Sequence, residues 1–178
     1  MLCFINPGHD RQLDSGAVNP VTGVRECDEA FVLGEMVQEC LEQTGVAVRL
    51  RQDDDLAAVC DEANDRKADL FVSIHFNAFN GKASGTETLV NTTPASLVLG
   101  HCIQQQIQAV LGLPNRGLKE RPKLWVLRGT IMPAALVEVC FIDHMADMVR
   151  YNAKKRETAA AIARGIKQYM EQQAAVAV

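Results

Sequence analysis

The sequence of 178 residues lacks any hydrophobic run that could cross a membrane. A transmembrane helix needs about 20 consecutive apolar residues, and polar or charged side chains interrupt every apolar run before that length. The first apolar run has no basic residue ahead of it and leads directly into Pro7-Gly8-His9, which is unlike a secretory signal peptide. We therefore expect a protein that is made in the cytoplasm and does not insert into a membrane.

The chain also lacks an excess of basic side chains. It has 18 Lys and Arg against 22 Asp and Glu, which gives a formal net charge of −4. Because nucleic-acid backbones are neutralised by clustered Lys and Arg, a nucleic acid is not expected as a partner. The basic cluster Lys154-Lys155-Arg156 opens a predicted helix, and we interpret it as the solvent-exposed face of that helix.

Closely spaced cysteine pairs are absent too. The six cysteines include no Cys-x-x-Cys pair and lie in apolar runs or on predicted helix faces, at Cys3, Cys27, Cys40, Cys60, Cys102 and Cys140. A disulfide framework or a cysteine zinc site needs other spacings. We expect reduced thiols that are buried as small apolar side chains.

What the chain does have is ample apolar material for one core. With 48% hydrophobic residues, it is expected to form a single domain over residues 1–178, with a frayed tail after about residue 171. Short apolar runs predict six strands, at 2–5, 46–50, 70–76, 86–90, 124–127 and 135–141. Helical spacing predicts helices at 26–44, 56–66 and 97–111, the last two capped by Asp55 and Ser96, and two more between about 145 and 170.

This alternation predicts an α/β fold in which a mainly parallel, twisted sheet of about six strands has helices on both faces. The loop between residues 76 and 86 is too short for a crossover helix, so the strand at 86–90 is expected to be antiparallel. In such sheets the loops at the carboxyl ends of the strands meet at one edge, where ligands bind.

Two histidines lie where predicted strands end at that edge. His9 follows the first strand, and His75 closes the third. A catalytic zinc site needs three protein ligands and an open position, and His and carboxylate are the usual donors outside cysteine sites. Glu26, at the start of the first long helix, is the candidate third ligand, but Asp28 and Glu29 are close by, and a first helical turn favours acidic residues for its dipole alone. Two imidazoles and one carboxylate would leave a charge of +1 on a divalent ion, which would polarise a carbonyl or a bound water.

Glu138 lies inside the apolar run 134–142. An ionised carboxylate in such a run costs several kcal/mol unless it is paired or lies beside a cation. A buried ion pair or an outward-facing strand position would explain it structurally. We favour a position beside the metal, where a carboxylate with a shifted pKa serves as acid and base.

Together these pieces resemble the zinc-dependent N-acetylmuramoyl-L-alanine amidases, and within them the catalytic domains of phage and prophage endolysins. The resemblance covers the chain in order from about Leu2 to Tyr169, and any one of its segments alone is weak. The segments are Asn6-Pro7-Gly8-His9-Asp10, Asp14-Ser15-Gly16-Ala17, Gly23-Val24-Arg25-Glu26, Ala63-Asn64 with residues 68–78, Gly85-Thr86-Glu87-Thr88, and residues 133–138 with Phe141-Ile142-Asp143.

The resemblance implies that His9, Glu26 and His75 hold Zn²⁺ and that Glu138 is the catalytic carboxylate. It favours Glu26 over its two acidic neighbours. The implied reaction is hydrolysis of the amide between the lactyl group of N-acetylmuramic acid and the L-alanine of the stem peptide, so the implied partner is peptidoglycan. The implied setting is that of an endolysin, which is made in the cytoplasm and acts on the cell wall after release. The wall type and the oligomeric state stay open.

Two departures from many bacterial members are Cys140 and His144, which stand where those members have Gly and Asn. We interpret His144 as a surface residue at the start of a helix rather than as a cleft residue. For substrate binding we predict Asn77, near the end of the third strand, and Arg128, which follows the predicted strand at 124–127 and would pair with a carboxylate. Asn6 and Thr130 are further polar candidates around the cleft.

Two alternatives remain open at this point. A zinc carboxypeptidase of similar sheet architecture would share the ligands but would need a firm pocket for a terminal carboxylate. A zinc-stabilised wall-binding module without turnover would not need Glu138, so the presence of that residue argues against this alternative.

Overall fold

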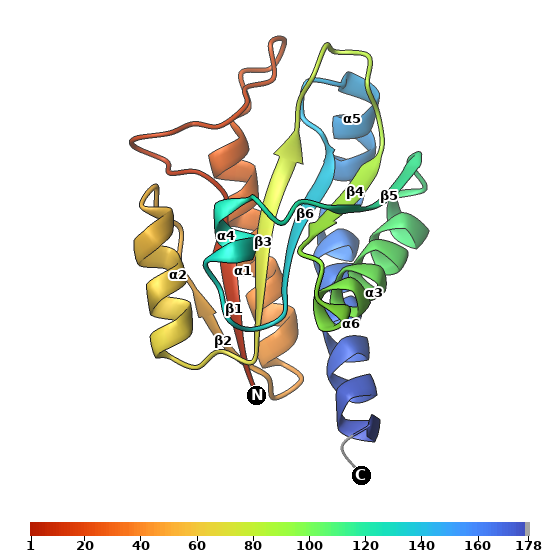
Figure 1. Cartoon of the computed structure of the whole chain (residues 1–178). Helices are drawn as coiled ribbons and strands as arrows, with labels where there is room; N and C mark the ends of the chain where they lie inside the picture. The colour runs from red at the N-terminus through yellow and green to blue at the C-terminus, as the bar shows by residue number, and fades with distance from the viewer. Residues whose placement is uncertain (177–178) are drawn as a thin grey trace.

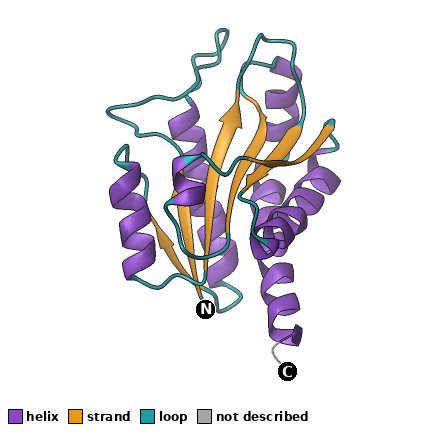
Figure 2. Cartoon of the chain, in the orientation of Figure 1, coloured by secondary structure: helices purple, strands orange, loops and turns teal. Residues whose placement is uncertain are grey.

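The computed structural model describes residues 1–176, and Figure 1 and Figure 2 show a central sheet flanked by helices. The strands are β1 (Leu2–Pro7), β2 (Ala47–Leu50), β3 (Leu70–Asn77), β4 (Thr86–Val90), β5 (Asn115–Glu120) and β6 (Ala134–Phe141). The helices are α1 (Glu26–Glu42), α2 (Leu56–Asp65), α3 (Pro94–Leu111), α4 (Trp125–Arg128), α5 (Met145–Ala153) and α6 (Lys155–Val176). Within residues 1–176, none of the helices is both long and apolar enough to cross a bilayer.

The sheet has the strand order β2-β1-β3-β6-β4-β5. The first four strands of this order are parallel to one another, whereas β4 is antiparallel to β6 and parallel to β5. The predicted α/β class, the mainly parallel sheet and the antiparallel strand at 86–90 are therefore confirmed. The carboxyl ends of β1, β3 and β6 share one edge, toward which the arrow of β3 points in Figure 1.

The two faces of the sheet are covered differently. One face packs β-strand residues such as Val72 and Val137 against α1, α3 and α6 in the larger apolar cluster. The other face packs Phe71 and Leu136 against α2 and the short α4. Since alternate strand residues point to opposite faces, His75 follows Phe71 onto this second face, and Glu138 follows Leu136.

Two elements differ from the sequence-based prediction. Residues 124–127 were expected to form a strand, but Trp125–Arg128 form a helical turn whose Val126 and Leu127 are buried against α2. A four-residue apolar run is compatible with either structure, so periodicity did not distinguish them. The true fifth strand, Asn115–Glu120, was missed because it is an edge strand rich in charged side chains and shows no apolar alternation.

The helix ends also bring corrections. Asp55 caps α2 as predicted, since its side chain accepts a hydrogen bond from the Ala58 N–H. Ser96 does not cap α3: Thr93 is the N-cap, and the buried Ser96 Oγ accepts a hydrogen bond from the Ala134 N–H at the start of β6, at 2.9 Å. Helix α6 continues to Val176, so residues 171–176 are helical; the frayed tail expected after about residue 171 stays a prediction, and residues 177–178 lie outside the described residues.

The structure agrees with the prediction of buried, free thiols for five of the six cysteines, whereas the predicted solvent-exposed basic cluster is wrong for two of its three residues. All six cysteines are free, and five of them are buried. In the basic cluster only Arg156 is exposed, because Lys154 donates to the carbonyl of Val110 at 2.7 Å and Lys155 pairs with Glu29 at 2.6 Å. These two lysines therefore hold the start of α6 to α3 and α1 instead of forming a solvated face.

The Ser96 contact generates a stability prediction. Ser96→Ala leaves the buried N–H of Ala134 without its acceptor, which is expected to lower the free energy of unfolding by about 1–3 kcal/mol. Thr93→Ala removes the cap of α3 and an exposed hydrogen bond from the Thr93 hydroxyl to Asn91, at a cost of about 1 kcal/mol. Urea unfolding of both variants, with the exposed Thr92→Ala as control, measures the difference. A loss for Ser96→Ala no larger than that for Thr92→Ala would contradict this role of Ser96.

Candidate metal centre

His9 lies two residues after the end of β1, in the loop that begins at Gly8. The N–H of Gly8 donates to the carbonyl of Ile74 at 2.8 Å, which keeps this loop attached to β3. His9 itself adopts a left-handed backbone conformation, with φ of 63°. Such a conformation is unfavourable for a residue with a side chain and persists where the surroundings fix it, often at functional sites.

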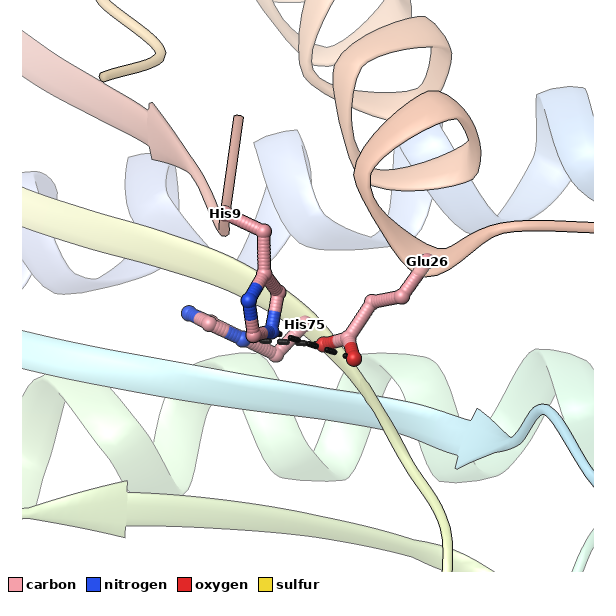
Figure 3. Close-up of side chains that lie close together, drawn as sticks. All are labelled: His9, Glu26 and His75. Atoms are coloured by element: carbon pink, nitrogen blue, oxygen red, sulfur yellow. Dashed lines mark hydrogen bonds and ion pairs between the residues drawn. The ribbon is translucent and has the colours of Figure 1, made fainter. Parts of the chain in front are cut away.

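Glu26 is the first residue of α1, and its carboxylate faces the two histidines (Figure 3). Its Oε2 lies 3.1 Å from Nε2 of His9, and its Oε1 lies 2.9 Å from Nδ1 of His75. Backbone N–H groups of Ala17 and Phe76 also donate to this carboxylate, each at 3.0 Å. Glu26 is only 4% exposed, so its position is fixed from four sides.

Two glycines of the predicted motifs make this close approach possible. A Cβ on Gly8 would lie 2.2 Å from Cε1 of His75. A Cβ on Gly16, which has φ of +62°, would lie 2.5 Å from Cδ2 of His9 and 2.7 Å from Oε2 of Glu26. The backbone at both positions therefore packs directly against the ligand side chains, and a larger residue would displace them.

The three side chains offer donor atoms that all lie within 4.8 Å of one another. The rings of His9 and His75 are 5.0 Å apart and nearly perpendicular, at 72°. Asp14 Oδ2 lies 2.6 Å from Nδ1 of His9, an arrangement that orients an imidazole and leaves its Nε2 to face a metal. Two imidazoles, one carboxylate and a second carboxylate behind one of the histidines fit the donor set of a catalytic zinc site.

Burial and hydrogen bonding set the charges of this array. The hydrogen bond that the His9 ring donates to the Glu26 carboxylate raises the pKa of His9 to about 9. Burial alone would raise the pKa of Glu26, but the hydrogen bonds with His75 and His9 outweigh it and hold that pKa below its usual range. Since a histidine binds a metal only when the coordinating nitrogen is unprotonated, metal binding here is expected to release a proton.

Glu138 lies next to the three ligands on β6. It is the register partner of His75 in the parallel pair with β3, on the sheet face that α2 and α4 cover. Its Oε2 is buried and has no hydrogen-bond partner among the residues that the structure describes. Burial raises the pKa of Glu138 to about 7, despite the opposing influence of His75. A carboxylate in this setting can both take up and give back a proton near neutral pH.

A cavity of about 200 Å³ opens beside the array. Its walls combine the two histidines with acidic side chains and an apolar side; the lining residues are His9, Asp14, Asp53, Asp54, Leu56, His75, Leu124, Trp125, Val126 and Leu136. Trp125 of α4 is 45% exposed, and the guanidinium of Arg128 lies 4.5 Å from its ring. The cavity provides space for a ligand that reaches the candidate metal ligands.

The structure thus brings His9, Glu26, His75 and Glu138 together, and each of the other predicted residues already has a contact within the protein. Asn77 donates from Nδ2 to Oε1 of Glu87 at 3.1 Å, and Arg128 ends a helical turn over Trp125 instead of following a strand. Asn6 is buried and accepts a hydrogen bond from the Ser73 hydroxyl, and the Thr130 hydroxyl donates to a backbone carbonyl. His144 is the N-cap of α5, as its interpretation as a helix-start residue requires.

Asp14 is a residue of this site to which the sequence reasoning gave no role. The clue was its place five residues after His9, within one of the segments that carry the family resemblance. Its function depends on a turn, because the backbones of Asp10 and Asp14 pair and return the chain toward His9. Spacing along the sequence does not reveal such a turn.

A family model described as N-acetylmuramoyl-L-alanine amidase matches residues 3–168. The chain belongs to this amidase family. Its relatives include the N-acetylmuramoyl-L-alanine amidase LytC of Bacillus subtilis, which is 34% identical over 152 residues, or 81% of this chain and 30% of LytC. The endolysin of Bacillus phage SPP1 is 37% identical over 155 residues, or 80% of this chain and 55% of the endolysin. The chain therefore spans about a third to a half of the length of these two relatives.

The fold of this chain agrees closely with that of an amidase whose structure has been solved. The N-acetylmuramoyl-L-alanine amidase AmiC2 of Nostoc punctiforme superimposes with a TM-score of 0.88 at 30% identity, over 96% of this chain and 97% of that one. The described sheet and helices thus match the fold of that amidase.

The charges of the site predict how stability depends on pH when metal is removed. The pKa of Glu138 is raised from 4.5 to about 7 in the folded protein, so folded molecules bind more protons than unfolded ones in that range, and stability falls as the pH rises from about 4.5 to 7. His9, with its pKa raised from 6.5 to about 9, adds a further loss between those values. Glu138→Gln removes the contribution of Glu138 to this fall in the free energy of unfolding, which amounts to about 3 kcal/mol.

Urea unfolding of the EDTA-treated protein at several pH values between 5 and 9 measures this dependence. The free energy of unfolding of Glu138→Gln is expected to stay nearly constant from pH 5 to 6.5, where that of the wild type falls. Above pH 6.5 the free energies of unfolding of both proteins fall. Glu35→Gln, on the exposed face of α1, controls for the loss of one carboxylate. Parallel curves for wild type and Glu138→Gln would show that the Glu138 carboxyl is not held in a proton-binding environment.

Proposed function

We propose that the chain is a zinc-dependent N-acetylmuramoyl-L-alanine amidase, which hydrolyses the amide between N-acetylmuramic acid and L-alanine in peptidoglycan. The observation that carries this proposal is the convergence of His9, Glu26 and His75 beside Glu138 in a chain that the amidase family model matches over residues 3–168. On this proposal residues 1–178 form one catalytic domain.

In this proposal His9, Glu26 and His75 hold the zinc ion, and Asp14 orients His9. When bound, the ion supplies a residual positive charge that polarises the scissile carbonyl and lowers the pKa of a nearby water. The contacts of Glu26 with the backbone of Ala17 and Phe76 keep its carboxylate in place, so the ligand set is organised before any ligand binds.

Glu138 performs the proton transfers. It takes a proton from the attacking water, whose oxygen forms the new bond to the amide carbon. It then delivers that proton to the alanine nitrogen as the carbon–nitrogen bond breaks. The products are a muramic acid carboxylate and a free alanine amino terminus. The half-buried position and raised pKa of Glu138 suit both transfers, since an efficient acid–base group has a pKa near the working pH.

The shape and charge of the site favour an amidase over a carboxypeptidase. A carboxypeptidase binds a terminal carboxylate within one residue of the scissile bond, which calls for a positive side chain next to the metal. The cavity beside the ligands is instead lined by Asp14, Asp53 and Asp54, and none of its lining residues is Lys or Arg. A wall-binding module without turnover would not need a buried carboxylate oxygen that has no partner within the described chain.

The proposed setting follows from one relative. The endolysin of phage SPP1 covers 80% of this chain. We therefore place the action of the chain on the bacterial cell wall, which it reaches after release from the cytoplasm.

The role of Glu138 predicts a separation of binding from turnover. Glu138→Gln should bind zinc as the wild type does, yet cleave purified peptidoglycan at least about 100-fold more slowly, because general acid–base catalysis contributes on the order of 10²–10⁴. Mass spectrometry of the released muropeptides gives the rate and identifies the new alanine amino termini. The control is Glu157→Gln, an exposed carboxylate of α6. A Gln variant that cleaves at nearly the wild-type rate would overturn this role.

The contact between Asp14 and His9 predicts a metal-affinity effect. Asp14→Asn should weaken zinc binding about 10–100-fold, since groups that orient a ligand histidine contribute by that amount. Competition with a chromophoric chelator measures the affinity, and Asp61→Asn, on the exposed face of α2, is the matched control. Equal affinities for the two variants would show that Asp14 does not orient His9 toward a metal.

A further inference from the structure

A second charged cluster lies on the same face of the sheet as the candidate metal ligands. Glu87 of β4 is directly opposite Glu138 in the antiparallel pair of β4 and β6. Its Oε2 accepts from Arg116 Nε at 2.7 Å and from Lys119 Nζ at 2.9 Å. Asn77 donates to its other oxygen at 3.1 Å. We call Glu87, Arg116 and Lys119 the β5 cluster, because both cations come from that edge strand.

The β5 cluster continues a row of polar side chains that crosses the sheet. His75 of β3 is in register with Glu138 of β6, and Glu138 is in register with Glu87 of β4. Neighbouring strands are about 4.8 Å apart, so Glu87 lies two strand spacings, or about 10 Å, from His75. A ligand that reaches the metal ligands and lies across the strands would therefore extend toward Arg116 and Lys119.

The guanidinium of Arg116 is hydrogen-bonded to the protein through Nε, and its two terminal nitrogens can bind a ligand. Its Nε is bonded to Glu87, and its guanidinium lies 5.0 Å from the centre of the Phe141 ring. Gly85 makes room for its stem, since a Cβ at that position would lie 2.9 Å from Cγ of Arg116. The two terminal nitrogens have no partner within the described residues, and the side chain is 35% exposed. This leaves the pair of N–H groups that binds a carboxylate in the bidentate manner.

The charge of the β5 cluster favours an anion. Burial alone would raise the pKa of Glu87, but Lys119 and Arg116 outweigh it and hold that pKa below its usual value, so Glu87 stays ionised. Two cations and one carboxylate leave a net charge of +1. Lys119 is 31% exposed, so this charge is open to solvent. Glu87 thus acts as a positioning residue that aligns both cations without cancelling them.

We propose that Arg116 and Lys119 bind a free carboxylate of the stem peptide, on the second or third residue counted from the alanine at the scissile bond. This inference rests on the proposed amidase function and adds a specificity site to it. An extended peptide advances about 3.3–3.6 Å per residue, so a side-chain or α-carboxylate two or three residues along spans the 10 Å to the β5 cluster. The same distance is too long for the terminal carboxylate of a carboxypeptidase substrate.

The competing interpretation is that the β5 cluster only fastens the edge strand to β4. A purely structural ion pair would change stability when it is broken, but it would not distinguish between two soluble substrates. The test therefore compares two synthetic N-acetylmuramoyl-L-alanyl tripeptides, one with free carboxylates on its second and third residues and one with all of these groups converted to carboxamides.

The wild-type enzyme is expected to cleave the free-carboxylate substrate with a kcat/KM at least about tenfold higher, mainly through a lower KM. In Arg116→Gln this ratio should fall toward one, and Arg116→Lys, which keeps the charge but not the paired N–H groups, should give an intermediate ratio. Arg121→Gln is the matched control, because Arg121 lies just beyond β5 and its guanidinium donates only to the backbone carbonyl of Glu120 among the described residues. Thermal unfolding verifies that each variant is folded.

A wild-type ratio near one, or a high ratio that Arg116→Gln and Arg116→Lys both keep, would overturn the proposal. If Arg116→Gln does not fold, Arg116→Lys decides by the same ratio. Failure of the proposed function looks different: the wild type would then release no alanine amino terminus from either substrate, even with zinc added.

Discussion

The arrangement at the edge of the sheet depends on one buried carboxylate, that of Glu26. It lies between Nε2 of His9 and Nδ1 of His75 and accepts two backbone hydrogen bonds, so it joins the loop after β1, the start of α1 and the end of β3. A buried carboxylate without such partners would cost several kcal/mol. Two of the groups that satisfy it are the imidazoles that a divalent cation would also use, so these three side chains already lie close to the arrangement of a ligand set.

The asymmetric covering of the sheet explains why chemistry is confined to one face. The helices α1, α3 and α6 bury one face completely in the larger apolar cluster, whereas α2 and the short α4 pack on the other. On this second face the residues beyond Phe71 and Leu136 change from apolar to His75 and Glu138. The strand register then sets the polar row that runs toward Glu87, so sheet geometry rather than loop conformation orders the groups.

The sequence predicted the parts of the fold that apolar periodicity specifies and missed those that long-range contacts specify. The strand that carries His75 and the helix starting at Glu26 were found because their apolar patterns are long. Helix α4 was mistaken for a strand, since four apolar residues fit both structures. Strand β5 was overlooked because Arg116 and Lys119 give it the composition of a loop. Asp14 contacts His9 only because the chain turns between them, and residue spacing along the sequence does not predict that turn.

X-ray absorption spectroscopy of the zinc-loaded protein tests the central claim most directly, because it identifies the atoms bound to the metal. The account predicts one zinc ion per chain, bound by two imidazole nitrogens and by oxygen, with no sulfur neighbour, and a His75→Ala protein that lacks this spectrum. The six free cysteines make the contrary result easy to recognise. A zinc ion bound through sulfur, or a spectrum unchanged in His75→Ala, would contradict it.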